Sequence, residues 1–234
     1  MPTNPYDEMA VHYDADVARN PINSLYAMPN TLALLPDVSG LRVLDAGCGS
    51  GYYTRELVGR GARVVAVDAS PRMVGLARRR VGPDAPVDWH VADLDEPLGF
   101  LSSATVDVVL APLVLHYLPD WSGPLGEFRR VLRPGGVLVV TVHHPFCEFE
   151  LSGSDDYFAV EPWSEMWFKD GLPVTMTFWR RPLEAMLGPL AEAGFALDVL
   201  REPQPLPEAQ TRSAQVWQAL TTRPRFLFLR LTAR

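Results

Sequence analysis

The amino-acid sequence predicts an α/β fold, in which a doubly wound parallel sheet carries helices on both faces. Between residues 41 and 142, short apolar runs alternate with stretches of helical periodicity. This alternation favours a parallel sheet, because each helix returns the chain to the edge where the next strand begins. Several runs are continuously apolar, as strands buried on both faces require.

The periodicity places seven strands and five main helices along the chain, after a mostly helical segment over residues 1–38. The strands are expected at residues 41–46, 62–69, 86–94, 105–115, 136–144, 196–203 and 224–233. The helices are expected at residues 52–61, 70–82, 123–136, 181–195 and 208–222. Ser70 followed by Pro71 is typical of a helix start, and Gly135 and Gly136 are expected to end the third helix.

Length and composition favour one soluble domain over residues 1–234. Hydrophobic residues make up 47% of the 234, which is ample for a core, and the net charge of −7 disfavours a nucleic-acid surface. The two cysteines, Cys48 and Cys147, form no CxxC pair, so neither a zinc knuckle nor a disulfide framework is expected. No signal peptide or membrane span is recognisable, and a cytoplasmic protein is expected.

A glycine loop between two acids is the most informative motif. The run LRVLDAGCGSG places Asp45 before three glycines on alternate positions, Gly47, Gly49 and Gly51, and the next strand ends at Asp68. Such a loop lets backbone N–H groups approach a ligand. It lacks the lysine of a phosphate loop, and Tyr52 stands where a dinucleotide fingerprint needs glycine.

The motif set resembles the class I S-adenosylmethionine-dependent methyltransferases. Asp45 with its loop resembles the first motif of that family, and Asp68 has the position of the acid that binds the ribose. VADLDE at 91–96, DVVLAPLVLHYLPDW from 107 and LRPGGVLVV at 132–140 resemble three later motifs in the same order. The resemblance implies a Rossmann-like sheet of seven strands, mostly parallel with an antiparallel last strand.

The resemblance also assigns cofactor roles along the chain. It implies that Asp45 faces the ammonium group, that Asp68 accepts from both ribose hydroxyls, and that Asp93 accepts from the adenine amino group. Met73 and Ala69 would pack on adenine, Leu94 would donate to it, and Ala111 would lie near the sulfonium. The full set of expected cofactor-binding residues is Tyr13, Asp45, Ala46, Gly47, Cys48, Gly49, Gly51, Asp68, Ala69, Met73, Asp93, Leu94 and Ala111.

Methyl transfer to an oxygen, nitrogen or carbon acceptor requires close approach and, for a protonated acceptor, a base. His116 is the first candidate, because it follows the fourth strand at the edge where open α/β sheets bind ligands. We expect it near the sulfonium with a pKa displaced from 6.5. His143 and His144 end the fifth strand, and at most one of them should enter the pocket, because adjacent strand residues point oppositely. We therefore place His143 second and expect no metal.

Residues 143–179 are expected to form an irregular lid over the acceptor, without a clear helix. They hold nine of the 23 aromatic residues, together with seven acids and one base. Long irregular insertions in compact domains are usually functional, and apolar walls suit a small organic acceptor. Simple coverage of a core edge is the alternative reading of the same aromatics.

The sequence thus predicts an S-adenosylmethionine-dependent methyltransferase with a small-molecule acceptor, without nucleic acid or membrane, as a monomer or homodimer. The first alternative is a protein that binds the cofactor for a structural, regulatory or rearrangement role. An NAD-linked oxidoreductase and a protein or tRNA methyltransferase are further alternatives, which Tyr52 and the acidic charge respectively disfavour.

Overall fold

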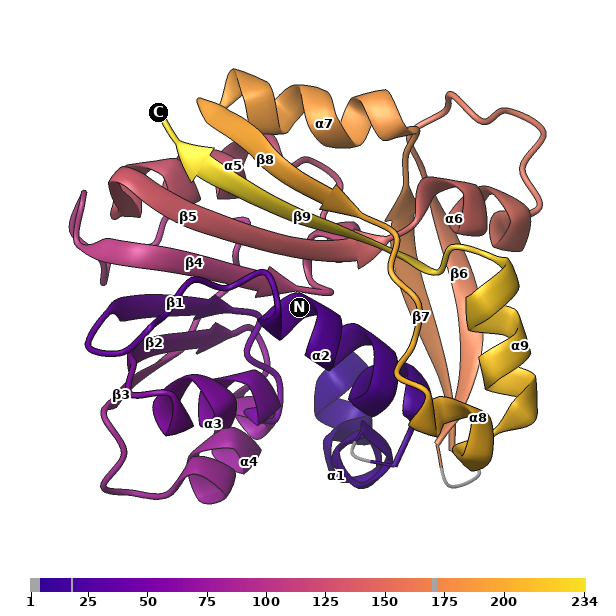
Figure 1. Ribbon diagram of the computed structural model, residues 1–234, viewed down its shortest axis with the longest axis horizontal. Helices are drawn as coiled ribbons and strands as arrows, with labels where there is room; N and C mark the ends of the chain where they lie inside the picture. Colours follow the sequence, from indigo (N-terminus) through magenta and orange to yellow (C-terminus); the bar gives the residue numbers. More distant parts are fainter. Residues whose placement is uncertain (1–4, 18, 170–171) are drawn as a thin grey trace.

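A seven-stranded sheet forms the centre of the protein (Figure 1). The computed structural model describes residues 5–17, 19–169 and 172–234. The strand order is β3-β2-β1-β4-β5-β9-β8, and only β9 runs antiparallel to its neighbours. The strands are β1 Arg42–Ala46, β2 Arg63–Asp68, β3 Val87–Val91, β4 Val106–Pro112, β5 Leu132–His143, β8 Phe195–Arg201 and β9 Phe226–Ala233. The predicted fold class, including the antiparallel last strand, is confirmed.

Helices cover both faces of the sheet, as the doubly wound prediction requires. Alternate residues of β2 enter opposite cores: Val65 and Val67 belong to the core that includes residues of α5 and α7, whereas Val64 and Ala66 belong to the core that includes residues of α3 and α9. The helices that follow strands are α3 Tyr52–Gly59, α4 Pro71–Val81, α5 Ser122–Val131, α7 Leu183–Glu192, α8 Glu208–Arg212 and α9 Ala214–Thr222. Three short elements complete this part, η1 Asn23–Ala27, α2 Met28–Leu32 and η2 Leu115–Tyr117.

Two expected helix boundaries are wrong, and each has a local cause. Helix α5 ends at Val131, before the glycines, because Pro134 disfavours helical backbone at Arg133 and the chain has already turned into β5. The helix expected over 208–222 breaks at Ser213, whose backbone is extended. The Ser213 side chain instead accepts from the Val216 N–H and caps α9.

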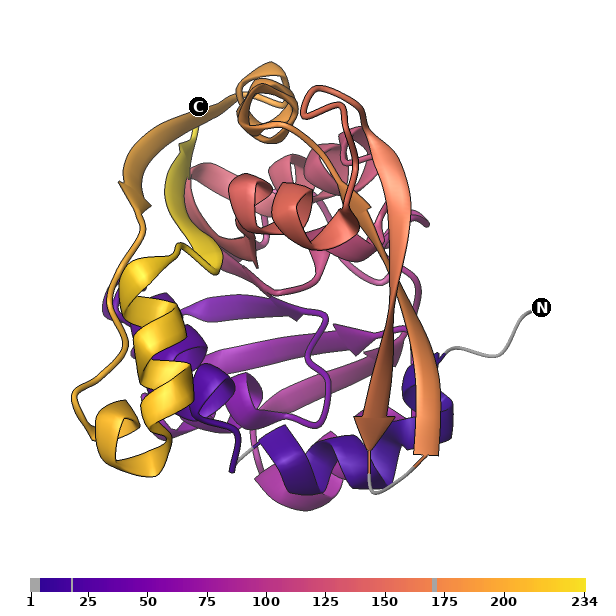
Figure 2. The ribbon, with the colours of Figure 1, turned by 90° about the vertical axis from the view of Figure 1, so that its right-hand side faces the viewer.

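The segment expected as an irregular lid is regular. It consists of helix α6 (Pro145–Ser152) and a long hairpin, β6 (Glu161–Lys169) paired with β7 (Leu172–Arg180). Proline at the first turn and a capping contact from His144 start α6. Burial alternates along β7, where Val174, Met176 and Phe178 are buried, and this is the period of a strand with one covered face. Figure 2 shows the hairpin descending beside the main sheet to the amino-terminal helix.

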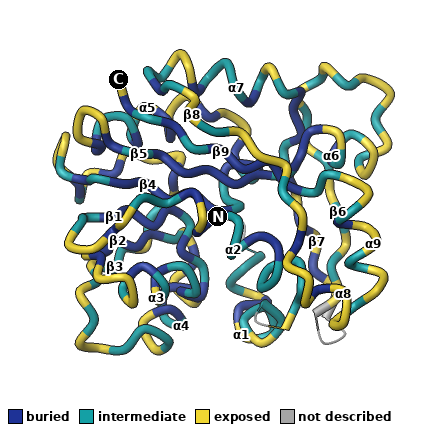
Figure 3. The backbone as a smooth tube through the Cα atoms, viewed as in Figure 1, coloured by how far each residue is buried: buried dark blue, intermediate teal, exposed yellow. Residues whose placement is uncertain are grey.

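The hairpin packs against α1 (Pro5–Val17) in a small core of its own. Met9 of α1 is fully buried against Val174, Met176 and Phe178, with tyrosine and tryptophan rings around them. Figure 3 shows the inner strands of the main sheet as the most deeply buried part of the chain, with the edge strands β3 and β8 and the hairpin less covered. Residues of α1 and of the hairpin, which are far apart in sequence, therefore form one wall over the carboxyl ends of the sheet strands.

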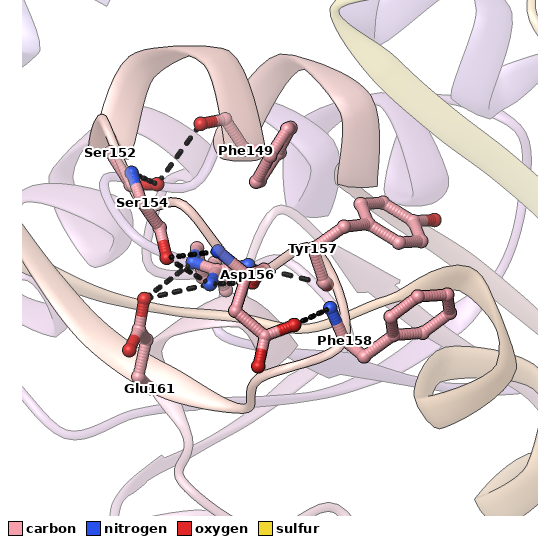
Figure 4. A network of polar contacts seen from close by, with 8 residues as sticks. Phe149, Ser152, Ser154, Asp156, Tyr157, Phe158 and Glu161 are labelled. Atoms are coloured by element: carbon pink, nitrogen blue, oxygen red, sulfur yellow. Dashed lines mark hydrogen bonds and ion pairs between the residues drawn. The ribbon is translucent and has the colours of Figure 1, made fainter.

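The base of the hairpin is fixed by Arg180, whose guanidinium hydrogen-bonds to residues of the loop before β6 and to Glu161. Figure 4 shows Ser154, Tyr157 and Glu161 close together in this polar network. Its Nη2 donates to the Ser154 hydroxyl (2.6 Å) and to Glu161 Oε1 (2.7 Å), and its Nη1 donates to the Tyr157 carbonyl (3.4 Å). Arg180 is buried, so these contacts compensate a charge that is removed from water. The loop between α6 and β6 is thereby tied to the end of β7.

None of the helices within the described residues has both the length and the apolar character needed to cross a membrane. In the same part of the chain, no three His, Cys, Asp or Glu side chains gather closely enough to hold a metal ion.

Candidate active site

A cavity of about 780 Å³ lies at the carboxyl ends of β1, β2 and β4. Open α/β sheets bind ligands at this edge, where the strand order reverses between β1 and β4. Nine of the thirteen expected cofactor-binding residues line it, namely Tyr13, Gly47, Cys48, Gly49, Asp68, Ala69, Met73, Asp93 and Leu94.

The glycine loop takes its shape from close packing around it. Gly47 has a φ of +76°, and a Cβ there would lie 2.6 Å from Val114 Cγ2, so a side chain at this position would clash with the chain after β4. Asp68 fixes the other side of the loop, because its carboxylate accepts from the Gly49 N–H (2.8 Å) and the Ser70 N–H (2.9 Å). Burial raises the pKa of Asp68, and these two bonds oppose that shift.

Four of the expected cofactor residues lie behind the cavity wall. Ala46 and Ala111 are fully buried in the core, and a Cβ on Gly51 would lie 2.8 Å from the Ala77 Cα, which shows how closely α3 and α4 approach. Asp45 is also fully buried, and one of its oxygens accepts from the Thr54 hydroxyl (2.6 Å). Burial raises the pKa of Asp45 to about 7.

The roof of this cavity includes residues of α1 and β7 that the motifs did not indicate. Tyr6 of α1 lies opposite Tyr117, with their hydroxyls hydrogen-bonded, and Thr175, Met176 and Thr177 come from β7. These segments are far apart in sequence, and only the packing of α1 on the hairpin brings them together. Two features of the sequence point to this wall: the cofactor role expected for Tyr13 and the aromatic density of residues 143–179.

A second cavity of about 340 Å³ adjoins the first. Five residues line both cavities and mark their junction: Tyr6, Tyr13, Asn23, Leu113 and Tyr117. Leu113 has a φ of +54°, a strained conformation for a branched side chain, and such strain is characteristic of ligand sites. The other lining residues are Asn20, Ile22, His116, His143, Met166, Trp167, Phe168, Arg225 and Phe226.

His116 lines this second cavity and does not line the first. Its ring stacks on His143 at a centroid distance of 3.7 Å, and the side chain is buried. Burial and the neighbouring His143, Arg181 and Arg225 lower the pKa of His116 well below its usual value, so the ring is neutral. Neither ring nitrogen has a hydrogen-bond partner among the described residues.

His143 is oriented by a buried acid that the sequence reading missed. Its Nδ1 lies 3.0 Å from Glu148 Oε1, and the Trp163 indole N–H also reaches that oxygen (3.4 Å). Burial lowers the pKa of His143 to about 3 and raises the pKa of Glu148 to about 7. The His143 side chain is 14% exposed and that of Glu148 only 1%, so the imidazole is the member of the pair that faces the cavity.

The adjacent histidine, His144, turns away from both cavities. Its Nδ1 accepts from the Phe146 N–H at the start of α6, and its Nε2 lies 2.7 Å from Glu202. His144 therefore caps a helix, and the expectation that only one of the two neighbouring histidines would enter the pocket agrees with this arrangement.

Comparisons with known proteins identify the family of the central part of the chain. Residues 44–140 match the family described as methyltransferase domain. A malonyl-[acyl-carrier protein] O-methyltransferase of Pectobacterium atrosepticum is 36% identical over 46% of this chain and 40% of its own length. A magnesium-protoporphyrin O-methyltransferase of Rhodobacter capsulatus is 40% identical over 47% of this chain and 49% of its own.

The match to these curated relatives therefore spans half of their length or less. A solved S-adenosylmethionine-dependent methyltransferase from Mesorhizobium loti is similar over a larger part of the chain. Its structure superposes with a TM-score of 0.72, at 25% identity, and covers 90% of this chain and 99% of its own.

Proposed function

Because the chain belongs to the class I S-adenosylmethionine-dependent methyltransferase family, we propose that it transfers the methyl group of S-adenosylmethionine to a small organic acceptor. The observation that carries this proposal is the pair of adjoining cavities, one lined by the glycine loop and Asp68, the other by aromatic rings. Two cavities with a common junction suit a reaction in which two bound molecules exchange a small group.

The residues of the larger cavity fit the cofactor chemically. S-adenosylmethionine has no phosphate, and the loop that lines the cavity contains no lysine or arginine. In this proposal Asp68 accepts from ribose hydroxyls and Asp93 from the adenine amino group, and Met73 and Leu94 supply apolar surface; that all four line the cavity supports these roles. Asp45 lies behind the loop, where its fully buried carboxyl group accepts from the Thr54 hydroxyl beneath the ammonium end.

The acceptor occupies the smaller cavity, with its reacting atom at the junction. The bound cofactor supplies an activated methyl group, and the chain must hold the acceptor in line and exclude water. For an acceptor that carries a proton, His143 is the base, because Glu148 takes its Nδ1–H and leaves the Nε2 lone pair for the cavity. His116 stacks beneath it as a neutral hydrogen-bonding group.

Cofactor identity can be tested by calorimetry with S-adenosylmethionine, its demethylated product and NAD. We expect saturable binding of the first two and none of NAD. Asp68→Asn should weaken cofactor binding roughly 10- to 100-fold, because charge-assisted bonds to the ribose contribute about 1.5–3 kcal/mol. Asp84→Asn, an exposed acid outside both cavities, is the matched control.

Two results would contradict the proposal: preferential binding of NAD, or unchanged cofactor affinity in the Asp68→Asn variant. The alternative of a cofactor-binding protein without methyl transfer makes a separate prediction. Such a protein would bind the cofactor and never convert it to the demethylated product, whichever acceptor is offered.

A further inference from the structure

We propose that the second cavity binds an aromatic carboxylate and that Arg225 holds its carboxylate group. The inference rests on the proposed function only in taking this molecule as the methyl acceptor. Three observations support it: the wall of the cavity contains no acid, Arg225 has no carboxylate partner among the described residues, and aromatic and imidazole rings line the cavity.

The wall of the second cavity has no acid, although the chain as a whole is acidic. The protein has 28 acidic and 21 basic residues, yet none of the fourteen lining residues is Asp or Glu. Arg225, His116 and His143 are the basic residues of the wall, and Glu148 lies behind His143. An acid-free cavity with a guanidinium selects an anion over a cation.

Arg225 has no carboxylate partner among the described residues. Its one side-chain hydrogen bond there is to the Cys147 sulfur at 3.6 Å, and thiols are weak acceptors. Arg223, two residues earlier, is by contrast paired with Glu150 on the surface. A partly buried guanidinium without a hydrogen-bonded carboxylate gains most from a planar carboxylate ligand, which it can bind through two parallel hydrogen bonds.

The rings around the cavity favour a flat molecule. Eight of the fourteen lining residues carry an aromatic or imidazole ring. His143 stacks almost parallel to His116 and to Phe226, with interplanar angles of 13° and 14°, so three rings lie in nearly parallel layers. The unpartnered nitrogens of His116 add a donor and an acceptor at this wall. Aromatic groups prefer such stacked surroundings.

The position of Arg225 also keeps the carboxylate of the acceptor away from the acceptor atom that receives the methyl group. Arg225 lines the second cavity alone, whereas the five shared residues lie where that cavity meets the first. A carboxylate on Arg225 therefore points the opposite end of the ring toward the junction. We infer that the carboxylate anchors the acceptor and that a hydroxyl or amino group across the ring receives the methyl.

Calorimetry on the full chain, saturated with the demethylated cofactor, tests this. The probes are p-hydroxybenzoate and a hydroxynaphthoate, each compared with its neutral amide. We expect each carboxylate to bind about 10- to 100-fold more tightly than its amide, the fold-change of one charge-assisted pair. Arg225→Gln should abolish this preference, Arg225→Lys should retain part of it, and Arg223→Gln should leave it unchanged.

Equal binding of acid and amide to the wild-type protein would overturn the inference, as would failure of all four probes to bind. A preference that survives in a folded Arg225→Gln variant would also overturn it. If that variant does not fold, the wild-type comparison and Arg225→Lys still decide. Cofactor binding is measured separately, so a protein that binds the cofactor but not the acids refutes this inference and leaves the proposed function intact.

Discussion

Glu148 lies behind His143, and its ionisation determines which ring nitrogen of His143 carries the proton. An ionised Glu148 accepts from Nδ1–H, so that Nε2 has a free lone pair. A protonated Glu148 donates to Nδ1 instead, and the proton of the neutral ring then moves to Nε2. Since burial raises the pKa of Glu148 to about 7, this change of tautomer occurs near neutral pH.

We therefore expect the turnover rate with a protonated acceptor to rise as pH increases through about 7. Glu148→Gln should lower turnover roughly 10- to 100-fold and remove this rise, while the affinity for the cofactor stays unchanged. Rates measured from about pH 5.5 to about pH 9 check this. Glu150→Gln, at an exposed position on the same helix, is the control. An identical rise in the Glu148→Gln variant would show that another group titrates.

Among the secondary-structure elements, the hairpin β6–β7 contributes to both cavities from different strands. Trp167 of β6 lines the second cavity, and Thr175, Met176 and Thr177 of β7 line the first. The hydrogen bonds of Arg180 to Ser154 and Glu161 fix the base of the hairpin, and the two strands extend from there along the cavities.

Trp167→Ala should impair use of the acceptor more than binding of the cofactor. Loss of one aromatic contact, worth about 1 kcal/mol, predicts a roughly fivefold to tenfold rise in the acceptor KM. Calorimetry should show cofactor affinity within about twofold of wild type. Trp179→Ala removes an indole of β7 that lines neither cavity, and is the control. Equal losses of both affinities with a lower Tm would mean that the hairpin only covers the core.

The sequence indicated the sheet and the floor of the site because both depend on local patterns. The buried strands are apolar runs, and the glycine loop with Asp68 is a short motif on two neighbouring strands. The hairpin contains no long apolar run, and its local strand signal is the alternation of Val174, Met176 and Phe178 with threonines in β7. Tyr6 and Glu148 carry no motif, and only tertiary packing brings them to the site.

At the scale of the whole molecule, buried acids link stability to pH. Asp45 and Glu148 have pKa values raised to about 7, so the folded chain holds protons that the unfolded chain releases above about pH 4. The stability from these protons is complete below about pH 4. It is lost as pH rises through about 7, and then levels off.

Asp45→Asn should flatten part of this dependence, because asparagine can still accept from Thr54 and does not ionise. Relative to wild type, the variant's free energy of unfolding should increase by roughly 3 kcal/mol between about pH 5 and about pH 8. Denaturant unfolding at these two pH values measures the difference. Asp84→Asn, at an exposed position, is the control and should show the same change in the free energy of unfolding as wild type between the two pH values. If the free energy of unfolding changed equally with pH in Asp45→Asn and in wild type, Asp45 would be ionised in the folded protein across this pH range.

The second cavity is formed mainly by segments that lie outside the stretch matched by the family. Only Leu113, His116 and Tyr117 of the second cavity fall within residues 44–140, and its other eleven lining residues lie outside that stretch. Mutations in α1, the hairpin or the start of β9 can therefore accumulate without touching the glycine loop. Sequence changes in these segments can therefore alter which acceptor is bound. Exchanging the same segments between relatives is a practical route to altered acceptor specificity.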